Sequence, residues 1–416
     1  MGRGFDILKK NGFLSFIVTN NWTTNSGAKK LRNIVLEESK ILSLIDFNSF
    51  MVFDSASIQT MIMQFQKTKP PKNYKFHFAK ITTKTPTYED LQDILNNKES
   101  KNNEILEINF SPKDFIGKTL NFTKNDYEEI FNKIQKYGNF YLKESEVAQG
   151  IVYPQENVNK KSLGILGEGF CIGQGIQKLT KEELKQLQLL EFEKSLLKPI
   201  YESDDIKKYF VEKNNNFWVI YTNSSFKKPN SMDNYPNLKK HLDRFQKVIT
   251  SDNKPYGLHR ARDERFFTGS SRIIALRKCV GEPKFSYVDF DCYVSATFYI
   301  IKTQKIDTKY LTAILNSKLI AFWLKHKGKM QGNNYQIDKE PLLNIPIPKI
   351  DSTNKALSDE IISLVEQILD SKAKDPTKDT KELESKIDNL VYQLYNLTND
   401  EIKIIEGNKC NFIYHS

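Results

Sequence analysis

Basic residues are concentrated between Lys254 and Lys278, where aromatic residues are interleaved with them. Only Asp263 and Glu264 offset this charge. An arginine guanidinium can grip a phosphate or read a guanine edge through two hydrogen bonds, whereas a lysine more often makes a non-specific phosphate contact. The segment therefore predicts contact with a nucleic acid, with a solvated or salt-bridged surface as the alternative. The residues that we expect to make this contact are His259, Arg260, Arg262, Arg265 and Arg272.

A second basic segment runs from Lys325 to Asn334 and combines lysines with glycine and amide residues. Small residues allow the backbone to approach a phosphate closely. We expect Lys327 and Lys329 to contact phosphates in this segment. From charge alone, a solvated helix end is an equally good interpretation.

Phe53 lies among small and polar residues in the segment Met51–Ser57, between two apolar runs. A phenylalanine in such a place most often packs in a core. An aromatic ring in a loop can also stack on an exposed base, because every base has a π-face. Both interpretations stay open on the segment alone.

Common catalytic motifs are absent from the sequence, which has no Gly-x-Ser-x-Gly, no Walker loop and no HExxH. Gly167 and Gly169 follow an apolar pair, but a cofactor loop needs a strand before it, a helix after it and an acidic residue further on. Ordinary turns are therefore the simpler interpretation. Four scattered cysteines and five histidines form no paired CxxC signature, so we expect no metal site and reduced thiols.

The composition favours a polyanionic partner. The chain has 416 residues, with 62 Lys+Arg against 51 Asp+Glu, which gives a formal net charge of +11. A surplus of this size favours nucleic acid first and an acidic membrane surface second. No apolar run is long enough to cross a bilayer, and the N-terminus lacks the apolar region of a secretion signal. We therefore expect a cytoplasmic protein without a membrane span.

The first 82 residues have the pattern of an α/β domain. The expected elements are strands at 13–18, 41–47, 58–65 and 75–81, the last as hairpin partner of the third, and a helix over 28–38. This order is typical of the second half of a doubly wound sheet. A buried strand at 13–18 needs a neighbour on each side, yet the sequence supplies no strand before it, so we expect an incomplete sheet.

Three further segments follow. Residues 83–139 are polar and are expected to form a bridging segment. From 140 to 350, short apolar runs, aromatic residues and frequent turns predict an α+β domain. In 351–416, two amphipathic runs separated by Asp375-Pro376 predict a helical hairpin tail. The expected fold class is therefore α/β followed by α+β, beginning with the truncated C-terminal half of a Rossmann-like sheet.

Several short segments of the chain form an ordered set. Gly12–Trp22, Val52-Phe53 and Ser57–Ile62 together resemble the strand region that follows the catalytic motif in adenine-N6 DNA methyltransferases of the TaqI-like and type IIG restriction-modification kind. Later segments resemble the TaqI-like C-terminal specificity domain and the tail of such enzymes. They are Lys198-Pro199-Ile200, Asp205–Tyr209, Tyr235–Leu242, Leu315–Lys318, Ile345–Pro348 and Asp388–Thr398.

The resemblance implies methyl transfer from S-adenosylmethionine to the exocyclic amine of adenine, with the base flipped out of double-stranded DNA. By position, Phe53 corresponds to the aromatic residue that stacks on the flipped adenine. The family's Asn-Pro-Pro-Tyr segment, its Gly-rich cofactor loop and its nuclease segment do not occur here, and the Pro-Pro pair is flanked by Lys69 and Lys72. We therefore expect S-adenosylmethionine in the complete enzyme and none bound by this chain alone.

These observations together favour the DNA-recognition portion of an incomplete adenine-N6 methyltransferase. Residues 1–82 would be the C-terminal half of its catalytic domain and 140–350 its target-recognition domain, with the missing motifs on an upstream methyltransferase or nuclease polypeptide. Two alternatives stay open, namely a specificity subunit that docks onto a separate catalytic chain and an inactive product of a split gene. RNA binding is less favoured, since no RNP-type aromatic motif occurs.

Overall fold

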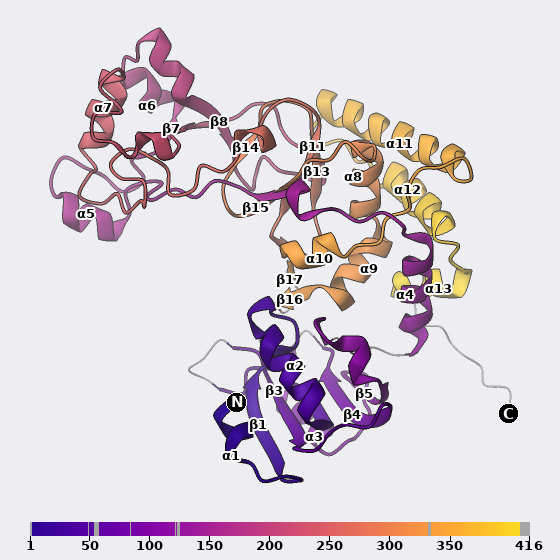
Figure 1. Cartoon of the computed structure of the whole chain (residues 1–416). Coiled ribbons are helices and arrows are strands. Elements are labelled where there is room, and N and C mark those ends of the chain that lie inside the picture. The colour runs from indigo at the N-terminus through magenta and orange to yellow at the C-terminus, as the bar shows by residue number, and fades with distance from the viewer. Residues whose placement is uncertain are drawn as a thin grey trace. The chain divides into compact units, whose positions relative to one another are not determined.

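A computed structural model of the chain describes residues 2–48, 50–53, 58–83, 85–120, 122, 125–331 and 334–407. The chain forms two compact units, whose elements are labelled in Figure 1. The first unit consists of Met1–Asn132 with Trp323–Gln336, and the second of Lys133–Phe322 with Ile337–Ser416. A short segment from late in the sequence therefore belongs to the first unit.

The first unit is built on a five-stranded mixed sheet in the order β1-β3-β2-β4-β5. β3 is antiparallel to both β1 and β2, β2 is parallel to β4, and β4 is antiparallel to β5. β1, β2 and β4 therefore run in the same direction, and their carboxyl ends lie at the same end of the sheet. The strands are β1 (Phe13–Thr19), β2 (Lys40–Asp46), β3 (Thr60–Gln66), β4 (Tyr74–Ile81) and β5 (Asn103–Phe110).

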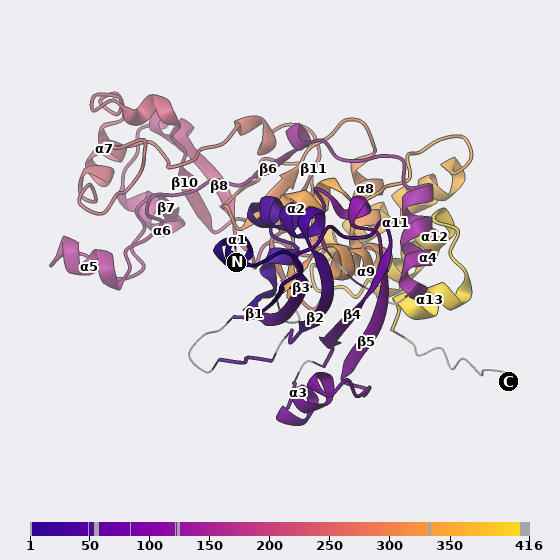
Figure 2. The ribbon, with the colours of Figure 1, turned by 60° about the horizontal axis from the view of Figure 1, so that its bottom comes forward.

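Helix α2 (Lys29–Glu38) packs its apolar residues on this sheet (Figure 2). Val35 and Leu36 of α2 are buried against Ile41 and Leu44 of β2. The apolar residues of this segment have helical spacing, and the helix buries them against the sheet as that spacing predicts. The other elements of the unit are α1 (Gly2–Ile7), α3 (Tyr88–Leu95), the first part of α4 (Asn125–Tyr137), the end of α9 (Lys318–Lys327), β16 (Lys329–Gln331) and β17 (Asn334–Gln336).

The predicted hairpin between residues 58–65 and 75–81 is wrong. β3 already has β1 on one edge and β2 on the other, so β4 takes the remaining edge of β2 instead. β4 then pairs on its other side with β5, a strand from the polar segment predicted as a bridge. The Pro-Pro connection between β3 and β4 is therefore a crossover within the sheet rather than a hairpin turn.

β1 lies at one edge of the sheet and pairs only with β3 among the described residues. Its side chains alternate between exposed and half-buried positions. Phe13 and Ile17, on its outward face, are 68% and 48% exposed. In the described part of the chain, this strand thus presents an unpaired and apolar edge.

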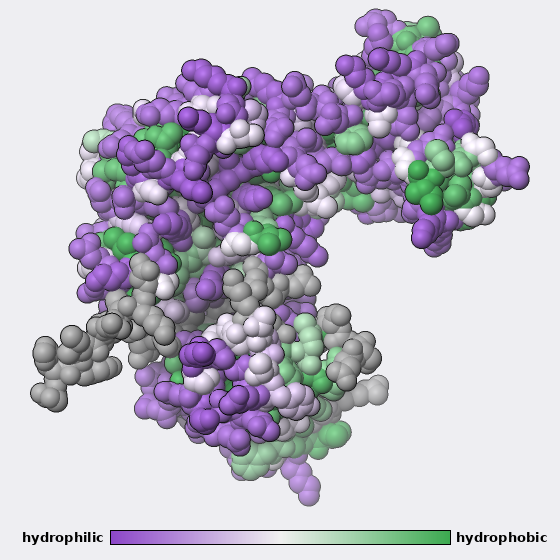
Figure 3. Space-filling model, turned by 180° about the vertical axis from the view of Figure 1, so that it is seen from behind, coloured by the Kyte–Doolittle hydropathy of each residue, from purple (hydrophilic) through white to green (hydrophobic). Residues whose placement is uncertain are grey.

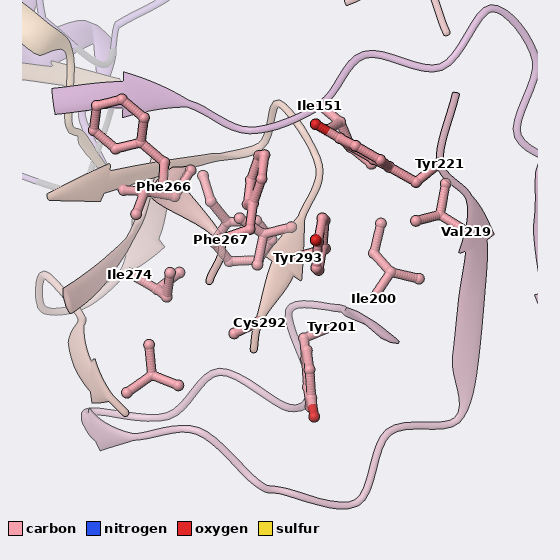
Figure 4. Close-up of a cluster of buried hydrophobic side chains, with 14 of the residues drawn as sticks. Ile151, Ile200, Tyr201, Val219, Tyr221, Phe266, Phe267, Ile274, Cys292 and Tyr293 are labelled. Atoms are coloured by element: carbon pink, nitrogen blue, oxygen red, sulfur yellow. The ribbon is translucent and has the colours of Figure 1, made fainter. Parts of the chain in front are cut away.

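The second unit contains two mixed sheets with the strand orders β14-β8-β10-β7 and β6-β15-β11-β13-β9. Residues of both sheets meet in one hydrophobic cluster that includes Ile200, Val219, Ile274 and Tyr293 (Figure 4). The strands are β6 (Val147–Gln149), β7 (Lys178–Thr180), β8 (Leu197–Tyr201), β9 (Tyr209–Phe210), β10 (Phe217–Ile220), β11 (Arg272–Leu276), β12 (Lys278–Val280), β13 (Phe285–Val288), β14 (Tyr293–Val294) and β15 (Phe298–Ile301).

Helices surround these sheets and form the end of the unit. Those of its first half are α5 (Lys160–Leu166), α6 (Lys181–Gln186) and α7 (Pro236–Asp243), and those of its second half are α8 (Thr308–Asn316), α10 (Lys339–Leu343), α11 (Lys355–Lys374), α12 (Lys381–Leu394) and α13 (Asn399–Ile405). The two predicted tail helices correspond to α11 and α12, which pack on each other. In the part of the chain that the structure describes, no helix has the length and apolar character needed to cross a bilayer.

Apolar side chains also reach the surface of the part that carries α5. In Figure 3, hydrophobic residues gather at the tip of this part, on a face that is otherwise mostly hydrophilic. The exposed apolar residues of this segment include Ile165 and Ile172, at 49% and 58% exposure.

Asp388 on α12 gives the second unit a testable pH dependence. Its Oδ1 accepts a hydrogen bond from the Lys318 backbone N–H at 2.8 Å, and burial raises the pKa of the carboxyl group to about 6. Because the folded pKa lies above the unfolded one, near 3.9, the stabilising contribution is complete below about pH 4 and is lost as the pH rises past about 6.

The Asp388→Asn variant keeps the acceptor and removes the charge. We expect it to raise the free energy of unfolding at pH 8 by about 1–3 kcal/mol, and to have little effect at pH 4, where the wild-type carboxyl is protonated. Urea unfolding at the two pH values measures the difference. The same change in stability at both pH values would contradict the assignment.

Candidate nucleic-acid interface

The arginine loop, residues 259–265, rests on the hydrophobic core of the second unit. Phe267, which follows the loop, is buried and stacks on Tyr293 with ring centroids 4.9 Å apart (Figure 4). The Tyr221 hydroxyl donates a hydrogen bond to the carbonyl oxygen of Arg262 at 3.4 Å. The backbone of the loop is thus fixed by packed aromatic residues, which gives its side chains a rigid base.

Arg260 and Arg265 extend from this loop into solvent, with side chains 49% and 63% exposed. Each makes one ion pair, Arg260 with Asp252 at 2.9 Å and Arg265 with Asp263 at 2.8 Å. Exposed ion pairs contribute only about 0–1 kcal/mol, so they are easily exchanged for a stronger partner. Both guanidinium groups can therefore take up a phosphate or a base edge at low cost.

His259 and Arg262 lie on the same loop but are more engaged with the protein. The Arg262 side chain donates to the Gly150 carbonyl at 3.2 Å and to the Gln149 side-chain oxygen at 3.1 Å, and burial lowers the pKa of its guanidinium. His259 Nδ1 lies 3.6 Å from an Asp252 carboxylate oxygen. The structure thus brings four of the five predicted contact residues together on one loop.

Arg272 does not join this group, although the sequence predicts it as a DNA contact. Its side chain is fully buried at the start of β11. The guanidinium donates to the backbone carbonyls of Phe267 at 2.5 Å and Ser270 at 2.9 Å, and also to those of Gly269 and Phe290. A fully buried side chain with these partners holds the protein together, so Arg272 leaves the set of predicted DNA contacts.

A polar pocket lies in the first unit, at the end of the sheet where β1, β2 and β4 terminate. We call it the carboxyl-end pocket, and its volume is about 100 Å³. Asn20 follows β1, Asp46 ends β2, and Lys80 lies next to Asp46 in the parallel pairing of β2 with β4. The described lining residues are Asn20, Asn21, Thr23, Thr24, Asp46, Asn48, Gln59, Met61, Phe78, Lys80, Leu120, Phe122, Lys325, His326, Gly328, Lys329 and Met330.

Of the two lysines predicted to contact phosphates, Lys329 lines this pocket and Lys327 does not. The Lys327 ammonium lies 4.4 Å from the centre of the Phe131 ring, and burial lowers its pKa. A half-buried ammonium on an aromatic face is less suited to a phosphate than one that faces a polar pocket. The assignment of Lys327 stays a prediction, and Lys329 has the better placement.

Phe53 lies in the connection between β2 and β3 and is 48% exposed. Its ring is therefore not enclosed in the core, which was the simpler interpretation of the sequence. The remainder of that predicted feature, Asp54–Ser57, lies outside the described residues. The role of Phe53 as a stacking residue stays a prediction.

Sequence reasoning missed several residues of the carboxyl-end pocket, above all Lys80 and Asn48. The sequence offered a general indication of the place of such a pocket, because ligands of open α/β sheets bind beyond the carboxyl ends of the strands. Asn20 and Asp46 stand at the ends of two predicted strands, and β4, which ends next to Lys80, was assigned the wrong partner. The pocket could not be located without that pairing.

An exposed arginine loop on a packed domain and a lysine-lined pocket at the end of an α/β sheet are typical of a protein that binds nucleic acid. Comparison with known proteins shows which nucleic-acid-binding proteins this chain is similar to. Residues 198–347 match the model of the TaqI-like C-terminal specificity domain, and residues 1–53 match the model of the Eco57I restriction-modification methylase. These matches confirm the resemblance seen in the sequence.

Relatives among characterised proteins agree with these matches. The type II methyltransferase M.HincII of Haemophilus influenzae is 23% identical over 386 residues, which cover 88% of this chain and 69% of that protein. The type II restriction enzyme and methyltransferase RM.Eco57I of Escherichia coli is 27% identical over 165 residues, which cover 36% of this chain and 16% of that protein.

A solved structure shares the fold. The type IIL restriction-modification enzyme MmeI, determined in complex with DNA, superposes with a TM-score of 0.57 at 13% sequence identity. The superposition covers 96% of this chain and 50% of the MmeI chain, so this chain spans half of that enzyme's length. The chain is thus similar in sequence to restriction-modification methyltransferases, and its residues 198–347 are similar to the TaqI-like C-terminal specificity domain.

Proposed function

We propose that this chain is the DNA-recognition portion of a site-specific adenine-N6 DNA methyltransferase of a restriction-modification system. One observation carries the proposal: the exposed arginines of the arginine loop lie inside residues 198–347, which match the TaqI-like specificity domain. Arginine forks held on a rigid loop are suited to reading base edges in the major groove. In this account His259, Arg260, Arg262 and Arg265 face double-stranded DNA.

Methyl transfer, in this account, uses S-adenosylmethionine in the complete enzyme. The sequence contains neither an Asn-Pro-Pro-Tyr segment nor a strand-loop-helix with the glycines of a cofactor loop. The carboxyl-end pocket, at about 100 Å³, is also smaller than the roughly 300–1,000 Å³ of typical cofactor sites. Phe53 is proposed to stack on the flipped adenine, which would offset part of the unstacking cost of a few kcal/mol.

The proposal predicts that the chain alone does not methylate DNA. The chain is incubated with labelled S-adenosylmethionine and duplex DNA containing many adenines, and incorporation is measured. We expect incorporation at the background level of a reaction without protein, and activity when a polypeptide with the cofactor loop and Asn-Pro-Pro-Tyr is supplied. Robust incorporation by the isolated chain would defeat this part of the proposal.

A specificity subunit that docks onto a separate catalytic chain is a second candidate function. Among the described residues, β1 has a free edge and its Phe13 and Ile17 are exposed, which favours this function because an edge strand can accept another strand. Co-expression with a methyltransferase chain tests this function. Co-purification that is lost when a proline replaces Ser15, in the middle of β1, would support docking at this edge, and unchanged co-purification would exclude it.

A further inference from the structure

The described residues of the carboxyl-end pocket carry a surplus of positive charge. Lys80, Lys325 and Lys329 line it, against the carboxylate of Asp46. His326 also lines the pocket, and burial together with the neighbouring lysines lowers its pKa to about 3. The imidazole is therefore neutral at pH 7, and the electrostatic potential in the pocket favours an anion.

The carboxylate of Asp46 is bound by the protein itself. Its Oδ1 accepts hydrogen bonds from the Asn20 side chain at 3.2 Å and from the Asn48 backbone N–H at 2.9 Å. Asp46 thus orients the residues that follow β1 and β2. The Asn48 side chain in turn donates to the Ile81 carbonyl at 2.9 Å, so the lysine ammonium groups are the donors that the pocket offers to an oxyanion.

The volume of the pocket limits the ligand. At about 100 Å³, the pocket is smaller than the roughly 300–1,000 Å³ of typical small-molecule sites. A space of this size is suited to one oxyanion group. A single phosphate of a longer strand, entering from the side, fits both the charge and the size.

The segment Trp323–Gln336 contributes two lysines, Lys325 and Lys329, to the lining of this pocket. A Cβ atom at Gly328 would lie 2.4 Å from the Leu324 carbonyl oxygen, so only glycine fits where α9 ends and β16 begins. Lys325 before this glycine and Lys329 after it both line the pocket. The glycine is thus needed where the helix ends.

We propose that the carboxyl-end pocket binds one backbone phosphate of a DNA strand through Lys80, Lys325 and Lys329. The inference rests on the proposed function, because it takes DNA as the ligand. It is supported by the composition of the pocket, which combines Asn20 and Asp46 from the region that matches the methylase model with lysines from the region that matches the specificity model.

The salt dependence of DNA binding tests the inference. The full chain is titrated with a fluorescent duplex at several salt concentrations, together with the Lys80→Gln and Lys329→Gln variants. A third variant carries Lys80→Gln, Lys325→Gln and Lys329→Gln together. We expect this triple variant to reduce the slope of log K against log[salt] by about 0.9, the value for one lost phosphate contact, and each single variant to reduce it by less. Sequence preference should stay unchanged. Lys75→Gln, an exposed lysine near the other end of β4, should keep the wild-type slope.

Neutral methylphosphonates placed one at a time along each strand locate the contact. One position should weaken binding of the wild-type chain and have no effect on the variant in which Lys80, Lys325 and Lys329 are all replaced by glutamine. A wild-type slope for the triple variant, with sequence preference still sensitive to Arg265→Ala, would overturn the pocket assignment and leave the proposed function standing. Loss of inorganic phosphate binding by ³¹P NMR without a change in slope would assign the pocket to a free anion and would also overturn it. No duplex binding by the wild-type chain at low salt would contradict the proposed function itself.

Discussion

Replacement of Arg272 by alanine is expected to lower the free energy of unfolding of the second unit by at least about 3 kcal/mol. The guanidinium is buried and donates to the backbone carbonyls of Phe267, Gly269, Ser270 and Phe290. Each buried acceptor that loses its donor costs about 1–3 kcal/mol, reduced where water can enter the space left by the side chain. Lysine cannot replace the planar fork, so Arg272→Lys should also be destabilising.

The matched control is Arg265→Ala, from the same basic segment. Its side chain is 63% exposed and makes one surface ion pair, so we expect a change within about 0.5 kcal/mol. Urea unfolding followed by circular dichroism gives both values. Equal stability of the Arg272→Ala and Arg265→Ala variants would show that the buried network does not stabilise the fold.

The second large effect is expected in DNA selectivity. Arg265→Ala or Arg260→Ala should reduce discrimination at one base pair by about 1–3 kcal/mol, or roughly 5- to 140-fold in relative affinity. The reason is the loss of a two-pronged contact to a base edge, made by a side chain whose surface ion pair is easily exchanged. Competition binding with duplexes changed at single positions measures the ratio.

Lys329→Gln provides the comparison for this experiment. A lysine that contacts a phosphate carries no sequence information, so its removal should weaken binding to all duplexes by a similar factor. If Arg265→Ala and Lys329→Gln both weaken all sequences alike, the assignment of base recognition to the arginine loop is wrong.

The strands of the first unit could be predicted largely from local pattern. Apolar runs at 13–18, 41–47 and 58–65 correspond to β1, β2 and β3. The pairing of β4 with β2 could not be predicted from local pattern. It depends on which strand edge is free once β3 pairs with both β1 and β2. β5 was missed because its residues are half-buried and mixed with polar ones in a polar segment.

The candidate site shows a similar division. The composition indicated the basic segment at 254–278. It did not indicate which of the arginines in this segment are exposed and which are buried. The Arg265 side chain is exposed, with one surface ion pair and a contact to the Phe266 ring, whereas Arg272 begins a strand of buried residues, Arg272–Leu276, and is buried with them. The apolar run that follows Arg272 was a signal for its burial. No comparable local signal pointed to Lys80, whose place in the pocket depends on the parallel pairing of β2 with β4.

The most direct test of the account is selection of bound DNA from a pool of random duplexes by the purified chain, followed by sequencing. The account predicts enrichment of one short sequence, with the preference at one of its positions relaxed in the Arg265→Ala variant. Binding that enriches no sequence, with the wild-type chain and the Arg265→Ala variant indistinguishable, would contradict the claim that this chain recognises a particular DNA site.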